Sequence, residues 1–232
     1  EPAAIGSGPS VADPTTLADA RAVLAKYGIK AASEIVAALA DPRNETLKPD
    51  APALAHARFE MVARPRAALD AAAAMLTRDG YRVEMLGDAL EGEAREVGRQ
   101  HAALALSARQ RGQRVAILSG GEFTVTVTGN GAGGPNQEYA LGLALGLDGA
   151  PGIAAIAADT DGIDGGSGNA RDPAGAFVFA DTLQRARERQ VDAAKMLQNN
   201  DSSGFFAAIG DLVHKGPTQT NVNDFRVILV TG

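Results

Sequence analysis

The sequence predicts an α/β fold in which a parallel, Rossmann-like βαβ layer is followed by a second, mixed α/β domain. In the first half, apolar strand-like segments alternate with helical patterns, an order that favours parallel pairing and right-handed crossovers. After residue 113 this alternation gives way to a mixed order of strands and helices. We therefore expect one domain at 1–113 and another at 114–232.

Two helices are expected near the start of the chain. Asp13 is a candidate N-cap, Pro14 suits the first helical position, and Gly28 ends the pattern. The buried stripe of this helix would contain Leu17, Ala20, Val23 and Leu24. Segment 33–41 predicts a short second helix, and the proline-rich stretch 42–52 predicts a loop.

The βαβ layer would consist of three strands and two helices. The strands are expected at 58–63, 81–86 and 114–122, and the helices at 65–80 and 91–112. The buried face of the first of these helices would contain Leu69, Ala73 and Leu76. In such sheets ligands bind at the carboxyl ends of the strands, where Ser119, Gly120, Gly121 and Glu122 are placed.

The second half contains less regular signals. Thr and Val alternate over 123–129, which favours a half-exposed strand, antiparallel or at an edge. Segment 135–147 is apolar nearly all round, as in a buried helix. Further strands are expected at 152–158, 174–180 and 225–230, and helices at 182–190, 192–200 and 202–211, with Asp181 and Asp201 as N-caps.

Composition limits the classes of function. The chain has 232 residues and a net charge of −6, so the basic surface that nucleic-acid binding requires is not expected. The absence of cysteine excludes disulfides, thiolate metal sites and cysteine nucleophiles. No apolar run approaches the roughly 18 residues of a membrane span, and no signal peptide is visible. We expect no membrane partner and a cytoplasmic location; because the first residue is Glu, we also expect a longer polypeptide.

The first candidate site is the turn Gly120–Gly121–Glu122. Two glycines after a buried strand allow backbone N–H groups to approach a ligand closely, and Glu122 could hold a hydroxyl or a metal-bound water. The structural alternative is a tight turn with a solvated glutamate.

The second candidate is the stretch "GNGAGGPNQE". Gly129, Gly131 and Gly134 match G-x-G-x-x-G after a predicted strand, and Asp159 ends the next strand, which is the outline of a dinucleotide fingerprint. Against this interpretation, the preceding strand is polar on one face. Asn136, Gln137 and Glu138 gather at the following helix start, where only one is needed as a cap. The alternative is a flexible loop with a polar helix cap.

The third candidate is the acidic loop "DTDGIDGG". Asp159, Asp161 and Asp164 would repel one another unless a cation or donors neutralise them, and carboxylate oxygens suit Mg²⁺. The EF-hand spacing is not met, because Ile163 occupies a ligand position. The alternative is an acidic turn stabilised by Asx bonds.

Other polar residues give weaker signals. Segment 218–224 holds Asn221 and Asn223 directly before a buried strand, and turns also use such residues. The three histidines share no motif, and His101 is expected to pack on a helix face with Val97 and Leu104. Ser7 lacks the surroundings of a nucleophile elbow.

These stretches, taken together, resemble a known family. "SGGEFTVTV", "GNGAGGPNQEYAL", "ADTDGIDG", "NND", "FFAAIGDLV" and "GPTQTNVNDFRVIL" occur in that order, and "AIGSGPSVADPTTLADARAVLAKYGI" precedes them. The string is similar to the glycerate 2-kinases that are also called hydroxypyruvate reductases. The resemblance makes 1–113 the latter part of an N-terminal domain and 114–232 a C-terminal, leucine-rich domain.

The resemblance implies a kinase that transfers phosphate from ATP, with Mg²⁺, to the 2-hydroxyl of D-glycerate, and it allows a homodimer. On this basis we expect Glu122, Asp159, Asp161 and Asp164 to be catalytic, the last two as metal ligands. Gly133 and Gly134 would contact phosphate. Substrate would be bound by Gly120, Gly121, Asn136, Gln137, Glu138, Asn221 and Asn223. One departure concerns Pro135, where many members of the family carry an arginine.

Two other functions stay open. An NAD(P)H-dependent hydroxypyruvate reductase would bind nicotinamide dinucleotide at 129–134. A non-catalytic binding or scaffold domain is the third possibility.

Overall fold

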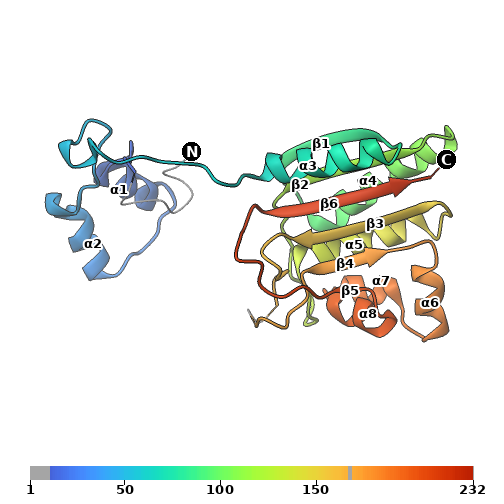
Figure 1. Cartoon of the computed structure of the whole chain (residues 1–232). Helices are drawn as coiled ribbons and strands as arrows, with labels where there is room; N and C mark the ends of the chain where they lie inside the picture. Colours follow the sequence, from blue (N-terminus) through green and yellow to red (C-terminus); the bar gives the residue numbers. More distant parts are fainter. Residues whose placement is uncertain (1–10, 167–168, 232) are drawn as a thin grey trace. The chain divides into compact units, whose positions relative to one another are not determined.

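A computed structural model describes residues 11–166 and 169–231 of the chain (Figure 1). The chain divides into two compact units, one formed by residues 1–62 and the other by residues 63–232. Each unit is described here by itself. Within the described residues, no helix is both long and apolar enough to cross a lipid bilayer.

The described helices and strands alternate irregularly along the chain. The first unit contains α1 (Leu17–Lys26), α2 (Ser33–Ala40) and two short 3₁₀ helices, η2 (Pro42–Asn44) and η3 (Pro52–Leu54). The second unit contains α3 (Pro65–Arg78), β1 (Arg82–Leu90), α4 (Ala94–Gln110), β2 (Val115–Gly121), α5 (Pro135–Leu147), β3 (Ile153–Asp159), β4 (Gly175–Val178), α6 (Thr182–Glu188), α7 (Ala193–Gln198), α8 (Ser202–Ile209), β5 (Leu212–Val213) and β6 (Asp224–Val230).

The first unit confirms both expected helices but corrects the start of α1. The N-cap is Thr16, because its side chain accepts a bond from the Asp19 N–H while the Asp19 carboxylate accepts from the Thr16 backbone. This reciprocal capping box satisfies two helix donors at once, which Asp13 could not do. The expected buried stripe is absent: no residue of α1 or α2 is buried, and Val23 is 51% exposed.

The strand predicted at 58–63 is wrong. Residues 57–64 have no regular secondary structure, and the side chain of Val62 is 92% exposed. The segment lies at the division between the two units, where no neighbouring strand supplies hydrogen-bond partners. Among the described residues, the parallel layer therefore consists of the single crossover β1–α4–β2.

The second unit is built around a six-stranded mixed sheet in the order β1-β2-β6-β3-β4-β5 (Figure 1), which confirms the α/β fold class. β1 and β2 are parallel, as predicted, whereas β6 is antiparallel to both β2 and β3. Consequently β3 runs in the same direction as β2. The carboxyl ends of β1, β2 and β3 meet the amino end of β6 at one edge of the sheet.

The observed division of the chain differs from the predicted boundary near residue 113. That boundary falls inside the second unit, between α4 and β2. β1 and β2 pair directly across it, and β2 continues into the same sheet as β6. A change in the order of elements along the sequence therefore does not coincide with a break in the sheet.

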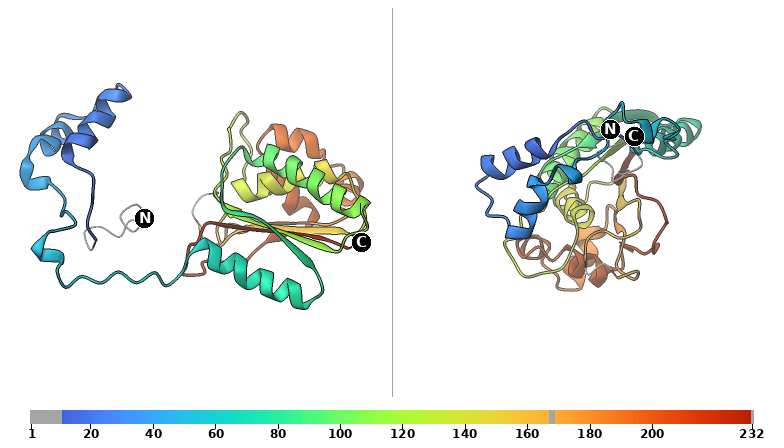
Figure 2. Two further views of the ribbon diagram at one scale, coloured as in Figure 1. Left: turned by 90° about the horizontal axis from the view of Figure 1, so that it is seen from above. Right: turned by 90° about the vertical axis from the view of Figure 1, so that its left-hand side faces the viewer.

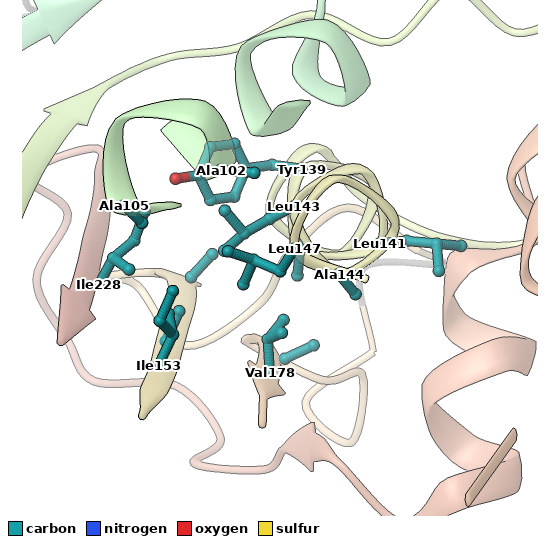
Figure 3. Packing of buried hydrophobic residues seen from close by; sticks show 14 of the residues in the cluster. Ala102, Ala105, Tyr139, Leu141, Leu143, Ala144, Leu147, Ile153, Val178 and Ile228 are labelled. Atoms are coloured by element: carbon teal, nitrogen blue, oxygen red, sulfur yellow. The ribbon is translucent and has the colours of Figure 1, made fainter. Parts of the chain in front are cut away.

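Helices cover the two faces of the sheet unequally. Figure 2 shows α3 on one face and α4 on the other. Leu69 of α3 packs on Leu118 and Val227, with Ala73 and Leu76 beside it, which confirms the predicted face of this helix. The larger core lies under α5, whose Leu143 and Leu147 point toward side chains of β3, β4 and β6 (Figure 3).

Helices α4 and α5 approach each other through glycines. A Cβ atom at Gly98 would collide with the backbone of Tyr139, and one at Gly142 with the backbone of Arg95. One at Gly146 would lie 2.7 Å from the Ala102 Cβ. Because glycine has no side chain, the backbones of α4 and α5 come into contact. This contact explains why α5 is buried nearly all round, as predicted.

The strand predicted at 123–129 is also wrong. Within this segment only Thr124 forms a ladder pair, an isolated bridge to Glu93. Several N–H groups bond to side chains instead: Thr126 donates to the Glu93 carboxylate (3.1 Å), and Gly129 to the Asn200 Oδ1 (2.9 Å). Because side chains satisfy the backbone here, no partner strand is required.

The remaining predicted helices and strands are confirmed, and their first or last residues differ slightly from those predicted. Asp201 caps α8 by accepting a bond from the Gly204 N–H (3.2 Å), whereas Asp181 makes no side-chain bond to the start of α6. His101 is buried as expected, and its Nδ1 lies 2.9 Å from the Tyr139 hydroxyl. Its expected neighbour Leu104 is 44% exposed instead.

Replacement of Gly142 by alanine should destabilise the protein. Alanine favours a helix by about 1 kcal/mol over glycine, yet overpacking costs about 1–3 kcal/mol, and here the obstacle is backbone. Urea unfolding should therefore show a loss, while Ala103→Ser on the exposed side of α4 should change stability little. A more stable Gly142→Ala variant would contradict the close packing of α4 and α5.

Acidification should weaken the fold through His101. Burial, assisted by the positive charge of Arg226, lowers the pKa of His101 from 6.5 to about 4. The unfolded chain therefore binds a proton below pH 6.5 that the folded chain refuses until about pH 4. Stability present above pH 6.5 is lost between these values, on the order of 3 kcal/mol.

Urea midpoints at pH 7 and pH 5 would measure this effect. The non-titrating variant His101→Gln should lose less stability over the same interval. Equal losses in the two proteins would show that His101 is not the source.

Candidate functional site

Three strand ends meet at the edge where β2 and β3 finish. In the ladder register, Asp224 at the start of β6 pairs with Gly121 on one side and with Asp159 on the other. Asp224 is 4% exposed, whereas Asp159 is half-buried. The edge therefore places two carboxylates near Gly120 and Gly121. These glycines are the buried last residues of β2, paired on both sides, so the tight turn predicted there is corrected to a strand end.

Asp164 caps helix α5 from a distant loop. Its Oδ1 accepts from the Asn136 N–H (2.9 Å) and Nδ2 (3.2 Å), and its Oδ2 accepts from the Gln137 N–H (2.8 Å) and Nε2 (2.9 Å). Negative charge is favoured at a helix N-terminus, where backbone N–H groups lack helical partners. Burial raises the pKa of Asp164, and these four bonds oppose the increase.

A second buried carboxylate, Asp224, continues this network. Its Oδ1 accepts from Asn136 Nδ2 (2.5 Å), and its Oδ2 pairs with the guanidinium of Arg226. Arg226 is 1% exposed and also donates to the Gly120 carbonyl oxygen (3.2 Å). Burial raises the pKa of Asp224, while Arg226 lowers it. Two buried atoms of the network, Asn136 Oδ1 and Arg226 Nε, have no hydrogen-bond partner among the residues that the structure describes.

Asp159 and Asp161 form the acidic turn that follows β3. Asp159 Oδ1 accepts from the Asp161 N–H (2.9 Å), and Asp161 Oδ1 accepts from the Ile163 N–H (2.8 Å), so the Asx bonds of the structural alternative are present. Burial raises the pKa of Asp159 to about 7, and the charges of Asp161 and Asp224 add to the increase.

The loop before β6 is bonded to this acidic turn. The Asn223 carbonyl accepts from the Thr160 hydroxyl (2.7 Å), and Asn221 Nδ2 lies 3.4 Å from Asp161 Oδ2. The Thr218 N–H donates to the Asp161 carbonyl (2.9 Å). The two polar loops singled out in the sequence are therefore neighbours.

Glu122 is exposed directly after β2. Partial desolvation and the charge of Asp224 raise its pKa, whereas Arg226 lowers it. Its N–H donates to the Leu90 carbonyl (2.9 Å), which fixes the end of β2 to β1. Glu122 is thus an accessible acid at the same edge as Asp159 and Asp224.

Glu138 differs from the other predicted residues at the start of α5. Its carboxylate is 2% exposed and pairs with Arg95 of α4, whose Nε lies 2.7 Å away. Asn200 also donates to it (3.2 Å). These contacts use Glu138 inside the protein, where it joins α5 to α4 and to the turn before α8.

The glycine-rich loop packs on the protein's own backbone. Cβ atoms at Gly129, Gly131 and Gly133 would collide with Asn199, Asp201 and Ser202 respectively, and one at Gly134 with Asp164. The dinucleotide fingerprint predicted at 129–134 is corrected by this geometry. No strand precedes the turn, and the α5 N–H groups that would receive a pyrophosphate are bonded to Asp164.

The acids at this edge fit Mg²⁺ only in part. The described residues contain no group of three acidic or histidine side chains placed to hold a metal ion. Asp164 fits poorly because its oxygens already accept four bonds from N–H donors. Asp161 and Glu122 fit better, since Mg²⁺ commonly takes one or two carboxylates together with substrate phosphates.

Comparison with known proteins gives consistent results. The MOFRL family matches residues 115–224, and a domain of unknown function, DUF4147, matches residues 1–40. A protein of Agrobacterium vitis named "Putative hydroxypyruvate reductase" is 52% identical over 99% of this chain and 52% of its own length. The D-glycerate 2-kinase of Thermotoga maritima is 34% identical over 97% of this chain and 52% of its own length.

Solved structures agree with these relatives. The crystal structure of glycerate kinase from Thermotoga maritima matches with a TM-score of 0.83 and 34% identity, over 99% of this chain and 54% of that one. The chain belongs to the glycerate kinase/hydroxypyruvate reductase family. It spans about half the length of the relatives that it matches.

In this family member, the structure brings most of the predicted residues to one edge and adds two. Gly120, Gly121, Glu122, Asp159 and Asp161 gather there, with Asn221 and Asn223 in the adjoining loop. The sequence pointed to Asp224 only as one member of the polar segment 218–224, and sequence reasoning missed Arg226. An available signal was a single arginine inside the apolar stretch "FRVILV", since a buried charge requires a partner.

Asp164→Asn should destabilise the protein. The amide supplies an N–H group where the helix start requires an acceptor, and an unsatisfied buried donor costs about 1–3 kcal/mol. Asp201→Asn is the matched control, because asparagine and aspartate cap helices equally well and Asp201 caps α8 locally. Urea unfolding should show a clear loss for the first variant only; equal stability of both would contradict the capping role of Asp164.

Proposed function

We propose that the protein transfers the γ-phosphate of ATP, with Mg²⁺, to the 2-hydroxyl of D-glycerate and releases 2-phosphoglycerate. The observation that carries this proposal is the meeting of Glu122, Asp159 and Asp161 beside the end of β2 at Gly120–Gly121. Phosphoryl transfer requires positioning and charge stabilisation rather than covalent chemistry, and this edge offers carboxylates that are not fully buried. The Thermotoga maritima relatives, named as glycerate kinases, support it.

Each group would have a separate task in this reaction. Asn221 and Glu122, which are both exposed, would bind glycerate beside the end of β2 at Gly120–Gly121. Asp159 would orient the 2-hydroxyl and receive its proton as the oxygen–phosphorus bond forms and ADP leaves. Asp161 would hold Mg²⁺, which supplies charge neutralisation at the phosphates. Asp159 would thus be the catalytic residue of this part of the site.

Buried residues would act through these accessible ones. Asn136, Gln137 and Asp164 are enclosed by their mutual bonds, so we assign them positioning roles rather than contact with substrate. Gly133 and Gly134 stay a predicted phosphate contact through their backbone. Asn223 and Glu138 support the neighbouring loop and helix.

The competing function is reduction of hydroxypyruvate with NAD(P)H. The name of the 52% identical Agrobacterium vitis relative favours it. The geometry of 129–134 does not support it, because the α5 N-terminus is already capped by Asp164. The cytoplasmic location and the homodimer stay predictions.

Activity can be tested with the protein in its full natural length. We expect ATP, Mg²⁺ and D-glycerate to give a 2-phosphoglycerate signal in phosphorus NMR, with constant NADH and NADPH absorbance in the presence of hydroxypyruvate. Falling absorbance without phosphoglycerate would support the reductase instead. If neither phosphoglycerate formation nor a fall in absorbance is observed, a non-catalytic domain would be favoured.

Asp159→Asn should lower kcat by about 100-fold or more, the usual effect of removing a group that transfers a proton. Asp148→Asn is the matched control, because this carboxylate is 81% exposed and lies at the opposite end of α5. Unchanged melting temperatures would show that both variants fold. If Asp159→Asn retained the kcat of the control, Asp159 would not have the proposed role.

A further inference from the structure

Arg226 is a cation buried beneath the carboxylate edge. It lies on β6 on the same face as Ile228, and its guanidinium sits 3.6 Å from the Phe123 ring centroid and 5.3 Å from that of Tyr139. Cation–π contacts of this kind operate within about 6 Å. With 1% of its surface exposed, Arg226 cannot touch a substrate, so any role in the reaction is exerted through its partners.

The partners of Arg226 lie on two different strands. One terminal nitrogen donates to the carbonyl of Gly120 at the end of β2, and the other binds Asp224 at the start of β6. The planar guanidinium holds these two acceptors in a fixed relation, which the single point charge of lysine cannot reproduce. Arg226 therefore adds a side-chain link between the end of β2 and the start of β6, where the ladder pairs Gly121 with Asp224.

The end of β2 is also held on its other side. Gly121 has a φ of +102°, and a Cβ atom there would collide with the backbone of Leu90. Leu90 also accepts the N–H of Glu122. The end of β2 is thus held between β1 and β6, and Arg226 reinforces the contact with β6 through its bond to the Gly120 carbonyl.

Stability alone gives a poor reason for this arginine. Buried ion pairs are frequently no better for stability than apolar side chains of similar size, because both charges lose hydration. Within the described part of the chain the Nε atom of Arg226 has no hydrogen-bond partner, which adds to that cost. The charges of Asp224, Asp164 and Glu122 all act on Arg226, so it faces the acids of the edge from below.

We infer that Arg226 is a positioning residue of the proposed active site, which links the end of β2 at Gly120–Gly121 to Asp224 and thereby fixes the place where the hydroxy acid is held. This inference rests on the proposed function. Arg226 would affect the binding of glycerate more than the binding of ATP, because the strand end that it holds leads directly into Glu122, a proposed glycerate contact.

Arg226→Lys tests this role in the full-length protein. Lysine can keep the ion pair with Asp224 but not the simultaneous bond to Gly120. We expect kcat/KM for D-glycerate to fall by about 100-fold, mostly through KM, with the KM for ATP unchanged. The matched control is Arg185→Lys, because Arg185 likewise binds a carboxylate, Asp211, and a carbonyl, that of Ile209, away from this edge. It should alter the melting temperature and leave both KM values unchanged.

A double variant separates positioning from folding. Arg226→Met with Asp224→Asn removes the charge pair as a whole and keeps an acceptor for Asn136. We expect the double variant to melt close to the wild-type temperature. Its KM for glycerate should be raised, as in Arg226→Lys. Wild-type kinetics in this variant or in Arg226→Lys would overturn the inference.

The two proposals can fail separately. If the wild-type protein forms no 2-phosphoglycerate, the proposed function fails. If the wild type is active and the Arg226 variants share its KM for glycerate, only the positioning role fails.

Discussion

The buried carboxylate of Asp164 is the contact on which the arrangement of the edge depends. An unpaired charge could not remain inside the protein, and here two consecutive residues of α5 supply four N–H donors to it. These bonds fix the start of α5 to the loop after β3. Through Asn136 they extend to Asp224 and β6, and through Gln137 to Ser203 of α8. One charge thus locates four segments that are distant in sequence.

The same contact explains why the glycine-rich stretch is not a dinucleotide turn. Glycines before a helix N-terminus commonly leave room for a phosphate. In this chain the anion at that position is the protein's own aspartate, and the glycines allow the loop to lie against residues 199–202. The spacing G-x-G-x-x-G therefore results from backbone packing on two sides, which the sequence pattern alone does not distinguish from ligand binding.

Elements whose contacts are local were predictable from the sequence. The helices at 65–80, 91–112 and 135–147 follow from periodicity and end signals, and the buried strands from their apolar runs. The strands expected at 58–63 and 123–129 do not form, because a strand also requires a partner with free backbone groups. Thr126 and Gly129 find side-chain acceptors instead. Thr16 replaced Asp13 as N-cap because Asp19 completes the box.

The site was predictable to the extent that it follows from strand order. Residues at the ends of β2 and β3 had to meet, whereas Asp224 and Arg226 depend on an antiparallel strand that joins them from the end of the chain. Arg226 and Gly120 are 106 residues apart.

The exposed acids of the edge and the buried cation Arg226 together determine the electrostatic field that a ligand meets. Since Arg226 is already paired with Asp224, the edge presents Glu122, Asp159 and Asp161 without a cation of their own among the contacts described. An anionic substrate that approaches such a field is repelled unless positive charge accompanies it. A nucleotide and the carboxylate of a hydroxy acid would both meet this repulsion, so either of them requires an accompanying metal ion at this edge.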